Sequence, residues 1–149
     1  MNVTALGGGR QTEGVLMSTM VFVNLPVADL ERSKEFFTKL GYSFNPQFSD
    51  ENAACLVISD TIYAMLLVKP FFKTFTKKEI TDATTHTEVI VALSADSREA
   101  VDELADRALA AGGQQTMDPM SEGPMYGRSF QDLDGHQWEV IWMDPSAVP

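Results

Sequence analysis

The residue best placed to do chemistry is Glu139, in the middle of a strand predicted near the C-terminus. Residues 130–142 hold an Asp-Gly pair at 134–135, a strong tight-turn signal between two runs that read as antiparallel strands. Side chains alternate along a strand, so Trp138 and Trp142 share a packing face and Glu139 points the other way. Burying an unpaired carboxylate costs several kcal/mol. A metal ion, a basic side chain, a ligand or water could each offset that cost.

Two more titratable side chains, His86 and Glu88, lie at the start of another predicted strand. Residues 88–93 alternate, with valines and a leucine on one face and Glu88 and Ile90 on the other, in phase with His86. A hydrogen bond to backbone or water would account for His86, and solvent would account for Glu88. A Glu88–Glu139 pair would instead raise the pKa of one carboxyl and could serve as an acid/base.

Composition excludes several classes of protein. A chain of 149 residues with 44% hydrophobic content can bury the core of one domain, or of two small halves that share a core. The formal net charge of -10 argues against binding nucleic acid or an anionic membrane. The single cysteine, Cys55, rules out an intrachain disulfide, fits a reducing cytoplasm, and lies in an apolar run typical of a core residue. No apolar run approaches about 18 residues, so we expect a cytoplasmic protein without a membrane span.

The pattern of predicted elements repeats once. The first half reads as a strand from residue 20, a helix over 30–40 capped by Asp29, and strands at 42–48, 53–59 and 61–68. The second half reads as a strand at 88–93, a helix capped by Asp96 and ended by glycines at 112–113, and strands at 114–117, 126–131 and 137–142. An internal duplication accounts for this order. Pairing two such halves would leave a concave sheet surface for a ligand.

Two stretches resemble a known family. The sequence FVNLPVADLERS at 22–33, followed by Phe36-Phe37 and Leu40-Gly41, resembles the opening of the vicinal oxygen chelate superfamily. DLDGHQWE at 132–139 resembles its closing motif, with leucine where proline is commoner. That superfamily includes glyoxalase I, bleomycin-resistance proteins, fosfomycin-modifying enzymes and extradiol dioxygenases. The likeness is nearest to glyoxalase-like proteins that are often labelled lactoylglutathione lyase.

The resemblance implies an α+β fold of two βαβββ modules, which form a curved mixed-sheet cavity with helices on the convex side. A single domain would span residues 20–144, after a flexible extension at 1–19 and before a tail at 145–149. Module one would cover about 20–68, a linker 69–85, and module two about 86–144. Superfamily members often pair their halves within or between chains, so the resemblance also implies a homodimer.

The resemblance further implies where a metal ion would be held. In glyoxalase-type members, side chains from strands of both halves hold a divalent ion, which polarises vicinal oxygens of the substrate while a carboxylate moves a proton. Carried over, those positions fall at Phe22, at Met65 or Leu66, at Ile90 and at Glu139. Only Glu139 offers a hard oxygen donor, and one ligand does not make a metal site.

A substitute ligand set is His86, Glu88 and Glu139, on the faces that the resemblance assigns to the cavity. One nitrogen and two carboxylates could hold Zn, Ni, Mn or Fe if they converged within about 2.0–2.2 Å of one ion. Strand geometry opposes this, because residues two apart lie about 6.6 Å apart along a strand. The sequence therefore leaves open whether a metal ion is bound.

The other candidates are ligand-binding positions. Asn24 shares the inward face with Phe22, where it could orient a ligand or satisfy a polar group at the sheet edge. If Phe130 packs under a helix, then Gly127, Ser129 and Gln131 on the opposite face of that strand line the pocket. Arg128 shares the face of Phe130, where it could form a structural ion pair or bind an anion. The predicted substrate-binding residues are Phe22, Asn24, Met65, Ile90, Ser129 and Gln131.

Two features lie outside the predicted strands. His136 sits in the tight turn, where we expect it to be exposed. The linker carries three phenylalanines, Phe71, Phe72 and Phe75, which could cover the pocket as a lid or pack against a second subunit.

Two functions from different classes survive. The first is a glyoxalase-like lyase or isomerase acting on a small oxygenated metabolite, such as a thiol conjugate, with Glu139 and Glu88 as catalytic residues. The second is a metal-free module that binds and sequesters a planar compound, as resistance proteins of this superfamily do. The apolar residues at three metal-ligand positions favour the second function, and the carboxylates keep the first open.

Overall fold

The computed structural model describes residues 18–147. The predicted flexible extension therefore lies almost wholly outside the described residues, as do the last two residues of the predicted tail. Within residues 18–147, no helix is long and apolar enough to cross a membrane.

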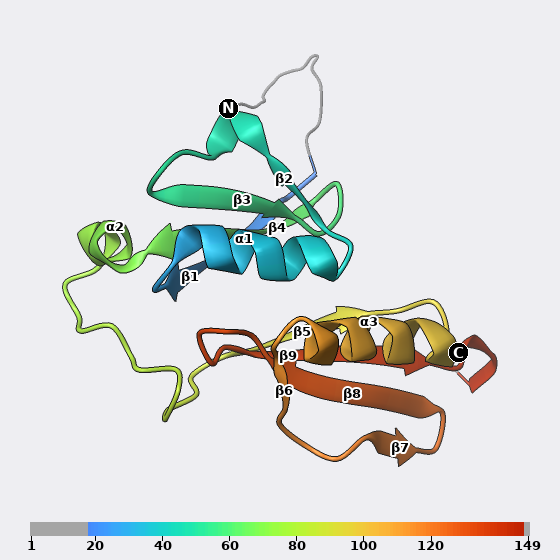
Figure 1. Ribbon diagram of the computed structural model, residues 1–149. Helices are drawn as coiled ribbons and strands as arrows, with labels where there is room; N and C mark the ends of the chain where they lie inside the picture. Colours follow the sequence, from blue (N-terminus) through green and yellow to red (C-terminus); the bar gives the residue numbers. More distant parts are fainter. Residues whose placement is uncertain (1–17, 148–149) are drawn as a thin grey trace, which may run out of the picture.

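Module one follows the predicted order of strand, helix and three strands (Figure 1). Helix α1 begins after Asp29, whose side chain accepts a hydrogen bond from the backbone N–H of Arg32. Its end falls just before Gly41, which adopts a positive φ of 106° at little cost because it has no Cβ. Strand β1 runs parallel to β4 in a sheet of order β1-β4-β3-β2. The elements are β1 (Val21–Val27), α1 (Leu30–Lys39), β2 (Ser43–Asn45), η1 (Pro46–Phe48), β3 (Ala53–Val57) and β4 (Ile62–Val68).

Module two repeats this plan with a longer helix and one extra short strand. Its sheet has the order β5-β9-β8-β6, with β5 parallel to β9 and the short strand β7 paired to β8. Between the modules, the linker begins with two short helical turns, α2 (Lys69–Phe72) and η2 (Lys73–Phe75). The remaining elements are β5 (Ile90–Ser94), α3 (Arg98–Ala110), β6 (Gln114–Gln115), β7 (Met120–Glu122), β8 (Met125–Gln131), β9 (Gln137–Met143) and η3 (Pro145–Ala147).

Three details of the predicted elements are wrong. Helix α3 is capped by Ser97, which accepts from the backbone N–H of Ala100, rather than by Asp96. Strand β5 begins at Ile90, so Glu88 precedes it. The strand predicted over 42–48 ends at Asn45, because Pro46 begins a 3-10 turn that the Asn45 side chain caps.

One hydrophobic core joins the two modules. Phe36 and Phe37 of α1 reach Phe130 and Trp138 of the second sheet, with ring centroids 6.5 Å and 5.3 Å apart. In Figure 1, α1 and α3 lie between the two sheets. Burial of Phe130 under the helices confirms the condition on which the predicted orientation of β8 depended. The helices therefore cover the inner face of each sheet and leave its other face outside.

The turn before β9 fastens module two to module one. The Asp134 carboxylate accepts from the backbone N–H of Ala28 (2.9 Å) and from the hydroxyl of Ser33 (3.2 Å). The Nε2–H of His136 donates to the carbonyl oxygen of Pro26 at 2.7 Å. The prediction of an exposed His136 is therefore wrong: the ring is half-buried because it bonds across the module boundary.

Asp132 holds that turn in shape from inside. Its side chain is 4% exposed and accepts from the indole N–H of Trp138 (3.0 Å) and from the backbone N–H groups of Asp134 (2.9 Å) and His136 (3.1 Å). Burial raises the pKa of Asp132, although the nearby His136 and these hydrogen bonds oppose the shift. Asp132, a carboxylate of the closing motif, thus bonds to neighbouring residues and has a structural role.

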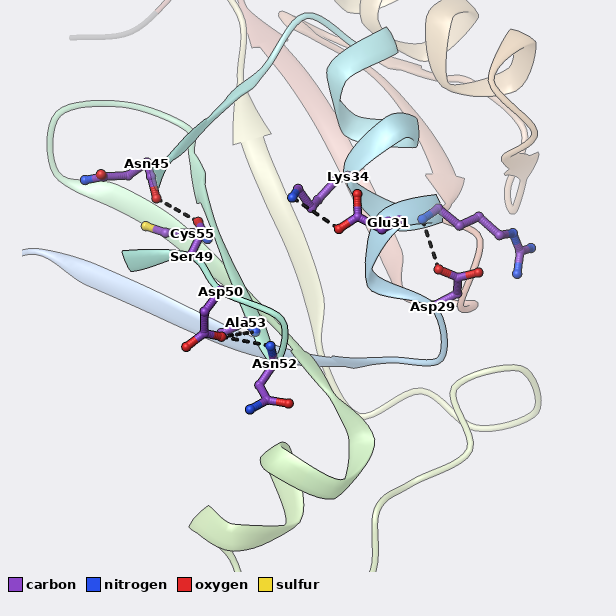
Figure 2. A network of polar contacts seen from close by, with 10 residues as sticks. Asp29, Glu31, Lys34, Asn45, Ser49, Asp50, Asn52, Ala53 and Cys55 are labelled. Atoms are coloured by element: carbon purple, nitrogen blue, oxygen red, sulfur yellow. Dashed lines mark hydrogen bonds and ion pairs between the residues drawn. The ribbon is translucent and has the colours of Figure 1, made fainter. Parts of the chain in front are cut away.

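A second small polar network sets the start of β3 (Figure 2). Asp50 accepts from the backbone N–H groups of Asn52 (2.8 Å) and Ala53 (3.1 Å). The hydroxyl of Ser49 donates to the carbonyl of Asn45 and accepts from the N–H of Cys55. Cys55 itself is buried as predicted, and burial raises the pKa of its thiol, so it stays a neutral core residue.

Candidate functional site

The outer faces of the two sheets carry most of the predicted site residues. Alternation places Leu25 and Trp138 in the core, so their neighbours on the same strands project outward. Strand pairing sets Asn24 opposite Met65 in module one, and Ala92 and Ser129 opposite Glu139 in module two. The outer-face residues from the prediction are Phe22, Asn24, Met65, Ile90, Ser129, Gln131 and Glu139.

The pairing also identifies equivalent positions in the two modules. Phe22 in β1 pairs with Tyr63 in β4, and Ile90 in β5 pairs with Gln137 in β9. Met65 lies two residues beyond Tyr63, and Glu139 lies two residues beyond Gln137. Met65 and Glu139 therefore occupy equivalent positions in the two modules. The sequence placed one metal-ligand position at either Met65 or Leu66, and the strand pairing assigns it to Met65. Leu66 is completely buried on the helix side.

Most donors needed for a metal are missing from these positions. Phe22 and Ile90 carry no donor atom, and the Met65 thioether is a soft ligand unsuited to ions that prefer oxygen and nitrogen. Within residues 18–147, no group of three or more His, Cys, Asp or Glu side chains is placed to hold a metal ion. The residues present do not fit a glyoxalase-type metal centre.

The substitute ligand set is not assembled either. Glu139 lies opposite Ala92, four residues beyond Glu88 along the chain. Glu88 precedes β5 and lines a cleft that does not include Glu139. His86 lines the same cleft, just after a turn, where its Nδ1 is 2.8 Å from the hydroxyl of Thr85. The predicted ligand set of His86, Glu88 and Glu139 is therefore wrong for the single chain.

The outer face of module one is aromatic. The rings of Phe22 and Tyr63 stack with centroids 4.9 Å apart and planes 21° apart. Phe22 is 46% exposed, and Ile90, at the equivalent position in module two, is exposed to the same 46%. Both β1 and β5 are also edge strands of their sheets. Exposed apolar side chains on an open edge are typical of a surface that contacts something else.

The outer face of module two is more polar. Glu139 is half-buried, and no side-chain hydrogen bond or ion pair joins it to another residue between positions 18 and 147. Its neighbour Ser129 is buried, accepting from the backbone N–H of Met117 (3.1 Å) and bonding the hydroxyl of Thr116 (2.8 Å). Ser129 is thus committed to the loop that covers it.

Arg128 plays the structural role that the sequence left as one alternative. Its guanidinium pairs with Asp102 (3.1 Å) and Asp106 (2.9 Å) on α3. The Tyr126 hydroxyl also donates to Asp102 and is the main reason why the pKa of Asp102 lies below its usual range. The arginine therefore fixes the helix to the sheet.

A cleft of about 370 Å³ collects the other titratable candidates. It lies between the end of β1, the linker and the turn at Gly135. Asn24, His86 and Glu88 line it, whereas none of Phe22, Met65, Ile90 and Glu139 does. The structure therefore divides the predicted site residues between two places. The aromatic linker could have indicated this cleft, but its depth depends on how the modules dock, which periodicity does not reveal.

Comparison with known proteins agrees with this geometry. Residues 19–59 match the family described as bleomycin resistance protein-like N-terminal. A hypothetical protein of S. aureus, SA1046, is similar in structure at a TM-score of 0.70 and 30% identity, over 87% of this chain and 96% of that one. The chain belongs to the vicinal oxygen chelate superfamily. Among curated proteins, no match is found.

Other solved structures of this superfamily share the fold. A glyoxalase/bleomycin resistance protein/dioxygenase family enzyme from Burkholderia phytofirmans has a TM-score of 0.70 at 15% identity, over 85% of this chain and 99% of that one. The fosfomycin resistance protein FosX from Listeria monocytogenes has a TM-score of 0.60 at 19% identity, over 84% and 90%, and was solved with Mn(II) and sulfate. At these identities the likeness establishes the α+β fold alone.

Proposed function

We propose that this vicinal oxygen chelate protein binds a planar aromatic small molecule on its outer sheet faces without needing a metal ion. The observation that carries this proposal is the set of side chains at the fold's four metal-ligand positions, of which only Glu139 is a hard donor. FosX, solved with Mn(II), shows that the fold can hold a metal when its residues allow. Here an aromatic surface stands where donors would be required.

The Phe22–Tyr63 stack provides the means of binding. Nearly parallel rings offer a flat face on which a third ring can stack at little entropic cost, because aromatic side chains have few rotatable bonds. Glu139 would add a negative charge to this apolar environment. A planar ligand with a cationic or hydrogen-bond-donating group meets both requirements.

A homodimer would complete the site. The outer faces of the two modules point away from their shared core, so a single chain presents two half-surfaces. Pairing the exposed edge of β1 in one copy with the edge of β5 in another would bring Phe22 of one copy toward Glu139 of its partner. It would also cover apolar side chains that water otherwise meets.

Titration with 9-aminoacridine, a planar fluorescent cation, tests the proposal. We expect saturable binding that is unchanged by a chelator and about fivefold weaker in Phe22→Ala, because one aromatic contact is lost. Phe48→Ala is the matched control, since Phe48 is exposed in η1, which follows β2 on the opposite edge of the sheet from β1. Loss of binding when a chelator is added would overturn the proposal that no metal is needed. Equal affinity in Phe22→Ala and in the wild type would overturn the proposed location of the site.

A second candidate is the glyoxalase-like lyase, with Glu139 as acid/base. The half-buried carboxylate on β9, which has no side-chain partner within residues 18–147, favours it. The test is turnover of the hemithioacetal of methylglyoxal and glutathione. Turnover that Glu139→Gln abolishes would support the enzyme, whereas its absence in wild-type protein leaves binding as the function.

A further inference from the structure

We propose that the cleft between the linker and the module junction is a second ligand site, which takes a small primary amine carrying an apolar ring. Neither the fold family nor the outer-face site accounts for this cleft. Its walls come from three segments that are distant in sequence, 24–26, 72–89 and 135–137. Its volume, about 370 Å³, falls within the range of small-molecule pockets.

The cleft is preformed because the linker is fixed at several points. A Cβ built on Gly135 would lie 2.6 Å from the carbonyl oxygen of Ala83, so the two backbones are in direct contact. Asp82 folds the next turn by accepting from Thr84. Further along, the ammonium of Lys73 donates to the carbonyl of Lys78 at 2.6 Å. A wall held in this way loses little entropy when a ligand enters.

The apolar part of the cleft determines the body of the ligand. Phe72, Ile80 and Val89 line it together with Leu25 and Pro26 at the end of β1. Val89 is 50% exposed, so a ring that covered it would remove apolar surface from water. A single ring with a short side chain suits this lining.

The charged groups determine the head of the ligand. Glu79 is already paired with Lys73 at 3.6 Å, and one nitrogen of His86 bonds Thr85. Glu88 has neither a hydrogen bond nor an ion pair with the rest of residues 18–147. Lys78 opposes it locally, but the chain carries a net charge of -10, so its field attracts cations. An ammonium group is therefore the best match for Glu88.

The experiment is calorimetric titration of the full chain with 2-phenylethylamine, 2-phenylethanol and phenylacetate. We expect the amine to bind most tightly, with millimolar affinity suited to its size. Glu88→Gln should weaken the amine by about fivefold and leave the alcohol unchanged, because only the ion pair is lost. Glu51→Gln, an exposed carboxylate of module one, is the matched control.

Two variants locate the ligand. Thr87→Trp should fill the cleft and abolish binding, while Glu139→Gln should leave the affinity for the amine unchanged. Loss of binding in Glu139→Gln would place the ligand on the outer face and overturn the proposal. Tighter binding of phenylacetate than of the amine would overturn the ligand class. Absence of saturable binding for all three compounds would overturn the site, without bearing on 9-aminoacridine at the outer face.

Discussion

The two modules share a plan but differ at equivalent positions on their outer faces. Where module one has Met65 on β4, with Cys55 beside it on β3, module two has Glu139 on β9, with Ser129 beside it on β8. Both inner faces are covered by helices and contribute to one hydrophobic core, to which module two adds the ion pairs of Arg128 with α3. Packing against the helices thus constrains the residues on the inner face of each sheet, whereas the residues on the outer face are free to differ between the modules.

The difference also shows why the family fold does not determine the activity. A metal centre needs several donors that converge within bonding distance of one ion, so losing three of four removes the centre. Packing needs only side chains of suitable volume, which the duplicated strands retain. The scaffold therefore persists here although the residues for metal chemistry do not.

The largest expected effect comes from the turns before the last strand of each module. Asp132→Ala should lower the free energy of unfolding by about 3 kcal/mol or more, because it leaves the Trp138 indole N–H and two backbone N–H groups buried without acceptors. The aspartate of the corresponding turn in module one, Asp60, is exposed, so Asp60→Ala should change this free energy by less than about 0.5 kcal/mol. Urea unfolding of both variants measures this contrast. Equal effects would show that the two turns do not differ.

The same turn gives a pH dependence. Burial raises the pKa of Asp132, so the native state keeps this proton at pH values where the unfolded chain, with a pKa of about 3.9, has released it. Its contribution to stability is therefore fully present below the unfolded pKa and lost as pH rises through the raised one. Subtracting the pH profile of Asp132→Asn from that of the wild type isolates this change. A difference that grows in the wild type's favour with rising pH would contradict the assignment.

Truncation should cost more stability at Ser129 than at Cys55, the residues beside Glu139 and Met65 on the outer faces. Ser129→Ala should cost about 1–2 kcal/mol, because the N–H of Met117 and the hydroxyl of Thr116 lose their partner. Cys55→Ala deletes only a small buried sulfur atom, and no side-chain hydrogen bond goes with it. It should cost about 1 kcal/mol. Thermal unfolding measured under one set of conditions compares the two. A larger loss for Cys55→Ala would mean that Ser129 is not committed to its loop.

How much the sequence predicted depends on the range of the interactions. Alternation and capping predicted β1, α1, β4 and β9, because these signals are local. The cleft and the exposure of the two outer faces did not follow, because both depend on how α1 packs against the second sheet. His136 was placed wrongly for the same reason: its partner, Pro26, lies 110 residues away. The substitute ligand set is not assembled within residues 18–147, because His86 and Glu88 line the cleft and Glu139 does not.

Association should depend on the paired edge strands. Phe22→Asp places a charge on the open edge of β1, where the proposed dimer would bury it. We expect sedimentation velocity to show the wild type as a dimer and this variant as a monomer. Phe48→Asp, at an exposed site away from both edges, should stay dimeric. A wild-type monomer would exclude a site shared between two copies.

The smallest expected effect on folding concerns the unequal pair itself. Glu139→Met makes the outer face of module two resemble that of module one. We expect a change of less than about 1 kcal/mol in stability, because the carboxylate has no protein partner to lose in residues 18–147. Affinity for 9-aminoacridine should nevertheless fall by about fivefold, since its cation loses a negative charge. Unaltered affinity would remove Glu139 from the site.

The central claim is that this superfamily member has lost the donors for a metal while keeping a surface that binds small molecules. Calorimetric titration with Mn(II) and with Zn(II), on wild-type protein and on Glu139→Gln, tests it most directly. We predict no stoichiometric binding tighter than millimolar in either protein. One ion bound per site at micromolar affinity, and lost in Glu139→Gln, would contradict the account.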